Sequence, residues 1–311
     1  MTQPVTVPYW LGPICALGAI SCFAVNDIVM KGLSTSYALH EIILFRAIFG
    51  LIVMLGIIVP LTSGYRALLT PRWPMHLARG GCIVFANTFF FMGLAAMPLA
   101  DCVALFFISP LLITGFSVVF LGETVGPRRW TAILVGLVGV IIVLRPGTSA
   151  FQSAALFPIA AAFGYAGLHT LTRKIGNTES AATMAFYLQA MFFSVSLTMG
   201  LTVGYGQLDT FDNVSLSFLF RAWVWPDASS VFAFAWLGLA TSVGGWLISQ
   251  AYRVSAPAHV APVEYVAIPF SVLGGILFFA EYPDRVALAG IALILASGLY
   301  MVWREGRGAR I

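Results

Sequence analysis

Two stretches of this sequence repeat the same landmarks in the same order. The first, PLADCVALFFISPLLITGFSVVFLGE, occupies residues 98–123, and the second, PAHVAPVEYVAIPFSVLGGILFFAE, occupies residues 257–281. Each begins with a proline, carries another proline twelve residues later, and ends in a small residue followed by a glutamate. The matched landmarks lie 158 or 159 residues apart. We therefore predict that the chain contains two copies of one structural unit.

The composition around these stretches is typical of a membrane protein. Of the 311 residues, 60% are hydrophobic and 9% are charged, and the mean hydropathy is +0.94. Soluble domains carry about 25% charged residues. A membrane-spanning helix needs about 20 apolar residues, so ten such helices leave no room for a sizeable soluble domain. The apolar runs also exceed the alternating segments of about 10 residues found in membrane β-barrels. We predict an all-α membrane protein.

Prolines, glycines and polar clusters divide the chain into ten apolar segments. The predicted transmembrane helices are residues 9–31, 41–62, 76–97, 100–121, 129–145, 153–174, 180–204, 232–253, 258–280 and 286–303. Each copy holds five helices, and because five is odd, the second copy enters the membrane from the opposite face. Met30-Lys31 and Arg173-Lys174 also match, at an offset of 143. We predict two inverted five-helix repeats, residues 1–147 and 148–311, around a central cavity, as in many secondary transporters.

The distribution of positive charge predicts which face is cytoplasmic, because cytoplasmic loops are enriched in Lys and Arg. One face carries Arg66, Arg72, Arg79, Arg128, Arg129, Arg173, Lys174, Arg253, Arg304, Arg307 and Arg310, and the other carries Lys31, Arg145, Arg221 and Arg285. We expect a plasma (inner) membrane protein with both termini in the cytoplasm, and interpret the net charge of +4 as topology rather than nucleic-acid binding. The four cysteines lack metal-ligand or disulfide spacing, and we interpret them as small buried hydrophobic residues. We expect no metal or other cofactor.

The ends of the repeats resemble a known family. Gly122-Glu123 and Ala280-Glu281, the Leu-Arg-Pro-Gly sequence ending at Gly147 and the five-plus-five organisation resemble EamA-type members of the drug/metabolite transporter superfamily. The resemblance implies a cavity lined mainly by the first, third, fourth, sixth, eighth and ninth helices, with alternating access and export of amino acids or related metabolites. Among the subfamilies, the chain resembles the aromatic amino acid exporters.

Pro110 and Pro269 lie inside predicted helices. A proline removes a backbone donor and frees the carbonyl four residues earlier, here those of Phe106 and Tyr265, which the 159-residue offset pairs. In hydrocarbon such carbonyls need protein or a wet cavity, and broken helices near the midplane are typical of transport sites. We predict that these four residues line the solute site. The alternative is two kinked helices whose carbonyls bond to a neighbouring Ser or Thr.

Four more residues are candidates for solute binding. The same offset pairs Asn87 with Trp246, which lie deep in predicted spans and need hydrogen-bond partners there. Tyr165 and His169 are four residues apart and therefore share a helix face. The alternative interpretations are a polar contact between helices for Asn87, core packing for Trp246, and a packing or headgroup residue for His169.

Ionisable residues inside the spans suggest function, because they are costly to bury there. Glu264 is a candidate ligand for a substrate ammonium, or half of an inner gate with Arg253 or Arg173; the alternative is an acid that reaches the nearby interface. Asp27 and Lys31 are spaced as an i,i+4 ion pair, with Arg46 at similar depth, and we interpret them as a structural pair or outer gate. Glu123 with Arg128 or Arg129, and Glu281 with Arg285, are expected to be solvated helix-end pairs.

The leading hypothesis is a secondary transporter that exports amino acids, aromatic or otherwise neutral, by alternating access. The alternative is an exporter or facilitator of another small metabolite or drug, such as a nucleobase. Proton coupling through Glu264, Asp27 or His169 and facilitated diffusion both stay open. The sequence has no phosphate-binding motif of an ATP-driven pump, no convergent catalytic cluster of a membrane enzyme and no channel filter. The expected partners are the solute and the lipid bilayer; an oligomer is compatible with the sequence but not required.

Overall fold

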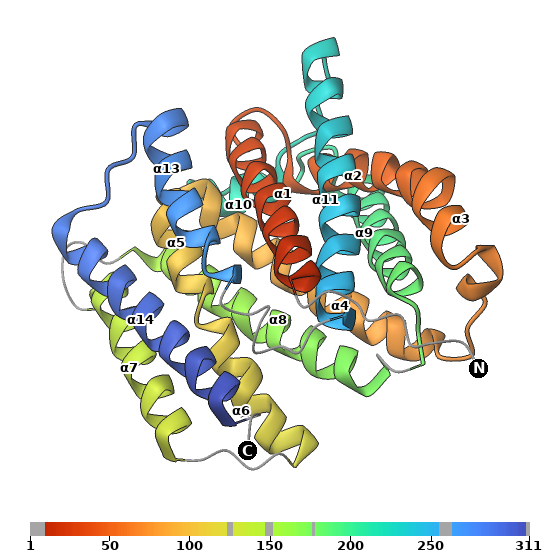
Figure 1. The fold of residues 1–311 in the computed structure, drawn as a ribbon. Helices are drawn as coiled ribbons and strands as arrows, with labels where there is room; N and C mark the ends of the chain where they lie inside the picture. The colour runs from red at the N-terminus through yellow and green to blue at the C-terminus, as the bar shows by residue number, and fades with distance from the viewer. Residues whose placement is uncertain (1–9, 123–126, 147–151, 176–177, 255–262, 309–311) are drawn as a thin grey trace, which may run out of the picture.

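The computed structural model describes residues 10–122, 127–146, 152–175, 178–254 and 263–308. These residues form helices and connecting turns (Figure 1). In chain order the elements are α1 (Leu11–Leu33), α2 (Leu39–Val53), the π-helical η1 (Met54–Ile58), α3 (Val59–Thr62), η2 (Tyr65–Leu68), α4 (Trp73–Ala96), α5 (Leu99–Phe106), α6 (Ser109–Leu121), α7 (Pro127–Leu144), η3 (Ser153–Ala155), α8 (Leu156–Ile175), α9 (Ala181–Val203), α10 (Val214–Phe220), α11 (Ala228–Val254), α13 (Ala267–Phe279) and α14 (Arg285–Gly308).

The predicted all-α membrane class is confirmed. Within the described residues, seven segments are long and apolar enough to cross a membrane, and three shorter apolar helices accompany them. The seven are Leu11–Leu33, Leu39–Thr62, Trp73–Ala96, Leu99–Phe120, Ser153–Thr172, Ala181–Val203 and Ala228–Ala251, and the three are Leu134–Leu144, Ala267–Phe279 and Arg285–Tyr300. In chain order they overlap the ten predicted spans, so hydropathy and helix breakers located the helices correctly.

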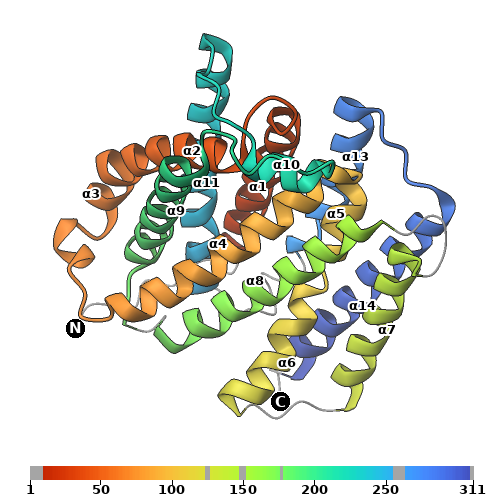
Figure 2. The same ribbon diagram turned by 180° about the vertical axis from the view of Figure 1, so that it is seen from behind.

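The main helix contacts are symmetric between the first five and the second five spans: each of them has an equivalent between the corresponding helices. Helix α1 packs on α11, and its counterpart α8 packs on α4. The equivalent helices α7 and α14 pack on each other, as do α2 and α9, and α5 and α13. Figures 1 and 2 show α4 beside α8, and α7 beside α14. This pattern supports two similar units, while the boundary at residue 147 stays a prediction.

The fourth and ninth spans share a broken geometry. Helix α5 ends at Phe106 and α6 begins at Ser109, and a matching turn at residues 265–266 precedes α13. Helices α6 and α13 both have 13 residues, and both end in a left-handed residue, Gly122 (φ 69°) and Ala280 (φ 53°). Each of these residues donates its N–H to the carbonyl five positions earlier, which satisfies an otherwise free helix-end acceptor. The landmarks that end the two stretches are therefore equivalent in structure.

Helices α7 and α14 approach closely through glycine. A Cβ on Gly290 would lie 2.9 Å from the carbonyl oxygen of Gly139 and 2.6 Å from Val143. We expect Gly290→Ala to push the helices apart and to destabilise the protein by about 1–3 kcal/mol, the usual cost of overpacking. Thermal unfolding in detergent measures this cost. Gly245→Ala is the control, because a Cβ there meets no described atom within 4 Å; equal melting temperatures for both variants would contradict the packing.

Candidate solute-binding site

Arg46 lies at the centre of a polar group between three helices. Its guanidinium donates from Nη1 to Oδ1 of Asn26 on α1 (3.5 Å) and from Nη2 to Oδ1 of Asn87 on α4 (3.3 Å). Asn26 in turn donates to Oδ1 of Asp27 (3.0 Å), so its amide bridges a cation and an acid. We call Asn26, Asp27, Arg46 and Asn87 the polar set. Arg46 is 2% exposed, and a charge buried in a transmembrane helix is by default a functional candidate.

Aromatic rings continue from this polar set towards the second repeat. The Arg46 guanidinium lies over the rings of Phe91 (5.7 Å) and Phe192 (4.9 Å). Phe91 touches Phe90 (5.4 Å between centroids), and Phe90 touches Phe106 at the break after α5 (5.1 Å). These contacts place a cation and flat apolar surfaces next to each other.

The aromatic contacts end on α8. Phe106 meets Tyr165 (5.1 Å between centroids), and Tyr165 meets His169 (4.3 Å). We call Phe90, Phe91, Phe106, Tyr165 and His169 the aromatic set. The structure thus brings together Phe106, Tyr165 and His169, which were predicted to bind solute. It also joins them, through Phe90 and Phe91, to Arg46 and the predicted Asn87.

The pairing of the broken helices differs from the prediction by one residue. The turns and caps match at an offset of 158, which pairs Tyr265 with Phe107 instead of Phe106, and these two rings are in contact (5.2 Å). The Tyr265 carbonyl is not free as predicted, because it accepts a hydrogen bond from the N–H of Ile268 (3.1 Å). Tyr265 is 4% exposed, and its ring lies against Gly298 of α14.

The two prolines occupy the first turns of the new helices. Pro110 is the second residue of α6 and Pro269 the third of α13. A proline costs little there, because the first turn of a helix leaves its N–H groups without intrahelical acceptors. Pro110 is half-buried, whereas Pro269 is exposed. The prolines therefore begin the second half of each broken span.

The predicted ion pairs have other partners. Lys31 does not form the predicted i,i+4 pair with Asp27; its Nζ lies 2.6 Å from Oε1 of Glu281 and donates to the carbonyl of Met97 (2.6 Å). Oε2 of Glu281 accepts from the N–H of Leu99 (2.9 Å), so Glu281 joins α1 and α5 to the end of α13. The predicted Glu281–Arg285 pair is therefore wrong.

Arg145 and Asp284 form a second and more exposed ion pair. Arg145 donates to Asp284, which links the end of α7 to the turn before α14. The hydrogen bond from Arg145 lowers the pKa of Asp284 to about 2, with help from the Ala287 N–H. Asp284 therefore stays ionised, and the pair stays charged, throughout the physiological pH range.

The remaining candidates lie apart from the polar and aromatic sets or are only partly described. Trp246 packs with Met54 and Ala185, and with Gln250 it lines a small cavity of about 40 Å³ between α3, α9 and α11. Glu264 precedes the turn at 265–266 and acts electrostatically on Tyr165. The side chains of Arg253 and Arg173 lie outside the described residues, as does Glu123, so their predicted pairings stay predictions.

Several residues of the site were not predicted. Asn26 could have been chosen as a candidate from the sequence, because it is polar and lies next to Asp27 in the same span. The Lys31–Glu281 contact joins two residues that the repeat had already singled out, so the repeat could have suggested this contact. No feature of the sequence distinguishes Phe90, Phe91 and Phe192 from other phenylalanines, because phenylalanine is common in apolar helices. Only the packing shows which rings face Arg46.

The apolar helices form two sets of five with equivalent contacts. A buried cation and clustered aromatic rings lie where the two sets meet. These features define a polytopic membrane transporter. Residues 10–145 match the EamA-like transporter family. The chain is 26% identical to the S-adenosylmethionine uptake transporter of Rickettsia prowazekii, over 95% of this chain and 94% of that protein. It is 27% identical to the riboflavin transporter of Vibrio cholerae (96% and 95%) and 24% identical to the pseudopaline exporter of Pseudomonas aeruginosa (92% and 94%).

A solved crystal structure shares the fold, with a TM-score of 0.61 and 21% identity over 92% of this chain and 94% of that one. Residues 10–145 thus resemble the EamA-like transporter family, and nearly the whole chain is similar to transporters of small metabolites. These findings support a multi-pass secondary transporter of small metabolites and not an enzyme. They give no support to amino acids over other metabolites. Its sidedness in the membrane stays a prediction.

Proposed function

We propose that this chain transports a small metabolite that combines a flat heteroaromatic ring with hydroxyl, amide or carboxylate groups. Riboflavin and S-adenosylmethionine, which name two of its relatives, have this chemistry. The observation that carries the proposal is the contact between the polar set and the aromatic set. The rings of the aromatic set suit the flat part of such a solute, and Arg46 with its amides suits the polar part.

Two buried polar atoms support this assignment. Nε of Arg46 and Nε2 of His169 are buried and make no hydrogen bond to the described residues. Buried polar groups normally have partners, and these two atoms belong to the two sets that we assign to the solute. The amino acid export predicted from the sequence receives no comparable support, so aromatic amino acids enter as a competing class.

Counterflow in proteoliposomes tests the proposal. Vesicles containing the purified protein are loaded with unlabelled riboflavin, S-adenosylmethionine, adenine, phenylalanine or tryptophan, and entry of the labelled solute is followed. We expect saturable counterflow of riboflavin or S-adenosylmethionine. Counterflow of phenylalanine or tryptophan alone would refute the proposed solute class. The same vesicles give the direction of net flux.

Phe106→Ala tests whether the aromatic set holds the flat ring. Stacking a base on an aromatic side chain contributes about 1–3 kcal/mol, so we expect the apparent affinity to fall by about 5- to 150-fold. Phe116→Ala is the matched control, because Phe116 is a ring of the same broken span that contacts Phe120 and Phe163 outside the aromatic set. Equal affinity losses in both variants would remove the aromatic set from the site.

A further inference from the structure

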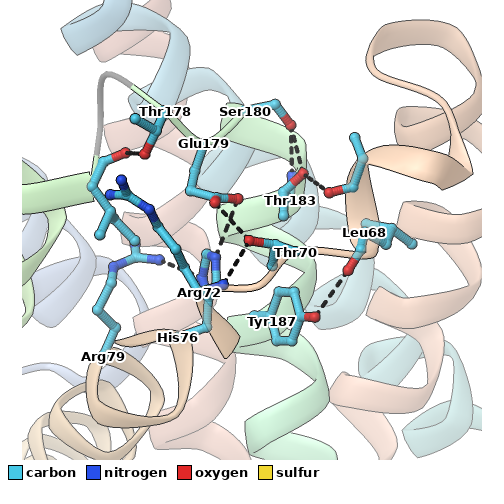
Figure 3. Close-up of polar contacts among 12 residues, drawn as sticks. Leu68, Thr70, Arg72, His76, Arg79, Thr178, Glu179, Ser180, Thr183 and Tyr187 are labelled. Atoms are coloured by element: carbon cyan, nitrogen blue, oxygen red, sulfur yellow. Dashed lines mark hydrogen bonds and ion pairs between the residues drawn. The ribbon is translucent and has the colours of Figure 1, made fainter. Parts of the chain in front are cut away.

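A second cluster of ionisable side chains lies near the start of α4, remote from Arg46 in the chain (Figure 3). His76 has a fully buried side chain, and its Nε2 lies 3.4 Å from Oε2 of Glu179 in the turn before α9. On the other side of the ring, Nδ1 lies 3.3 Å from Nη1 of Arg79. The imidazole therefore sits between a carboxylate and a guanidinium.

This geometry fixes the protonation state of His76 in the structure. A guanidinium can only donate hydrogen bonds, so Nδ1 must accept from Arg79 and carries no proton. The single proton of the neutral ring is then on Nε2, facing Glu179. Nε2 makes no well-aligned hydrogen bond to any described atom, which leaves the contact with Glu179 free to tighten when the ring becomes charged.

The cluster joins the two predicted repeats. Arg79 also donates from Nε to Oγ1 of Thr172 on α8 (2.9 Å). Oε1 of Glu179 accepts from Thr70, in the segment before α4 (2.7 Å). Tyr187 of α9 stacks on His76 at 4.4 Å and 13°. Thr70, His76 and Arg79 belong to the first repeat, and their partners belong to the second.

Few charged or titratable groups surround His76 among the side chains that the structure describes. Arg79 faces it from its own helix, Glu179 from the turn before α9, and Tyr187 from α9 itself. The charge of Arg79 also interacts electrostatically with Cys82 on α4 and His169 on α8. Arg72, in the turn before α4, is exposed and donates its backbone N–H to Thr70 (3.1 Å).

A second proton on His76 would change these contacts in opposite directions. It would bind Nδ1, where two donors and two positive charges would then meet, so Arg79 would have to withdraw from the ring. The bond from Arg79 to Thr172 on α8 would be strained by that movement. The positive ring would instead attract Glu179 more strongly. Protonation would thus weaken a contact of α4 with α8 and strengthen its contact with the turn before α9.

We propose that His76 is the site at which this carrier binds a coupling proton. Binding and release of this proton move α4 between α8 and the turn before α9 during transport. The proposal rests on the transport activity proposed above. The proton comes from water on the arginine-rich face and adds to Nδ1 as the Arg79 hydrogen bond breaks; its release restores that bond. This site differs from Glu264, Asp27 and His169, which the sequence suggested for proton coupling.

Counterflow under imposed pH gradients tests coupling, with riboflavin and S-adenosylmethionine as probes. For one coupled proton, a gradient of one pH unit changes the equilibrium ratio of solute concentrations across the membrane by up to about tenfold. His76→Gln keeps an N–H that can face Glu179 but cannot take a proton. We expect this variant to retain counterflow at uniform pH and to lose the response to the gradient.

His40→Gln is the matched control. His40 is 1% exposed and stacks on Trp223, but its Nδ1 faces the carbonyl of Leu219 (3.0 Å) and not a guanidinium. It should respond to the gradient like the wild type. A gradient response that survives in His76→Gln, or that disappears only in His169→Gln or Glu264→Gln, would overturn the proposal.

A direct measurement of the ring separates this proposal from the proposed function. Nitrogen NMR of histidine-labelled protein, with His76→Gln to assign the signal, reports both ring nitrogens without any solute. We expect a neutral ring with its proton on Nε2 that gains a second proton as the pH is lowered. A ring that stays neutral refutes the proton site even if transport is found. A titrating ring without counterflow of any solute refutes the transport proposal instead.

Discussion

Replacing Arg46 by methionine should strongly reduce transport and destabilise the protein. Methionine fills the space between Phe91 and Phe192 but leaves the Asp27 carboxylate without the cation that the Asn26 amide bridges to it. Removing one partner of a buried charge pair costs about 3–5 kcal/mol, so we expect a lower melting temperature. Loss of charged hydrogen bonds to the solute, worth about 1.5–3 kcal/mol each, should reduce counterflow by about 10- to 100-fold.

The double variant Arg46→Met with Asp27→Asn separates binding from folding. It removes both charges, so most of the lost stability should return. Transport should stay low, because the donors for the solute are still missing. Recovery of transport together with stability would show that Arg46 only neutralises Asp27 and does not bind the solute.

Breaking the contact between Lys31 and Glu281 should slow transport without removing solute binding. This contact ties α1 and the start of α5 to the end of α13. If alternating access requires that end of the bundle to close, Lys31→Met should lower the counterflow rate by about tenfold, which corresponds to ~1.4 kcal/mol in the barrier. The affinity for solute should be nearly unchanged.

Two variants control for nonspecific effects of charge. Exchanging the residues, as Lys31→Glu with Glu281→Lys, should restore part of the rate. Arg145→Gln removes the neighbouring pair with Asp284, which is more exposed, and exposed pairs contribute only about 0–1 kcal/mol. Equal slowing by Lys31→Met and Arg145→Gln would show that neither pair acts as a specific closure.

The sequence predicted the helices because these depend on long apolar runs and on local breakers. The ten predicted segments overlap the seven long and three shorter apolar helices of the described residues. The small residues before the final glutamates of the two stretches, Gly122 and Ala280, adopt the same left-handed conformation. The register of the broken helices was wrong by one residue. The prolines match at 159 residues but the turns match at 158, and proline tolerates either position in the first turn of a helix.

The side-chain partners depend on which helices pack together, and local sequence patterns do not specify this packing. The i,i+4 rule selects Asp27 for Lys31, but the lysine lies in the last turn of α1 and reaches Glu281, 250 positions away in the chain. Trp246 was selected because it is deep in a span, yet helical spacing does not tell which neighbour its ring meets. Asn87 and Arg46 were each singled out, and only the crossing of α2 and α4 shows that they share one site.

The most direct test of the account is a structure of the protein with a transported solute bound, riboflavin or S-adenosylmethionine. We predict density for the flat ring against Phe106 and Tyr165, with the polar part within hydrogen-bond distance of Arg46 or Asn87. Solute density in the cavity beside Trp246 and Gln250, with the polar and aromatic sets packed as they are here, would contradict the proposed site.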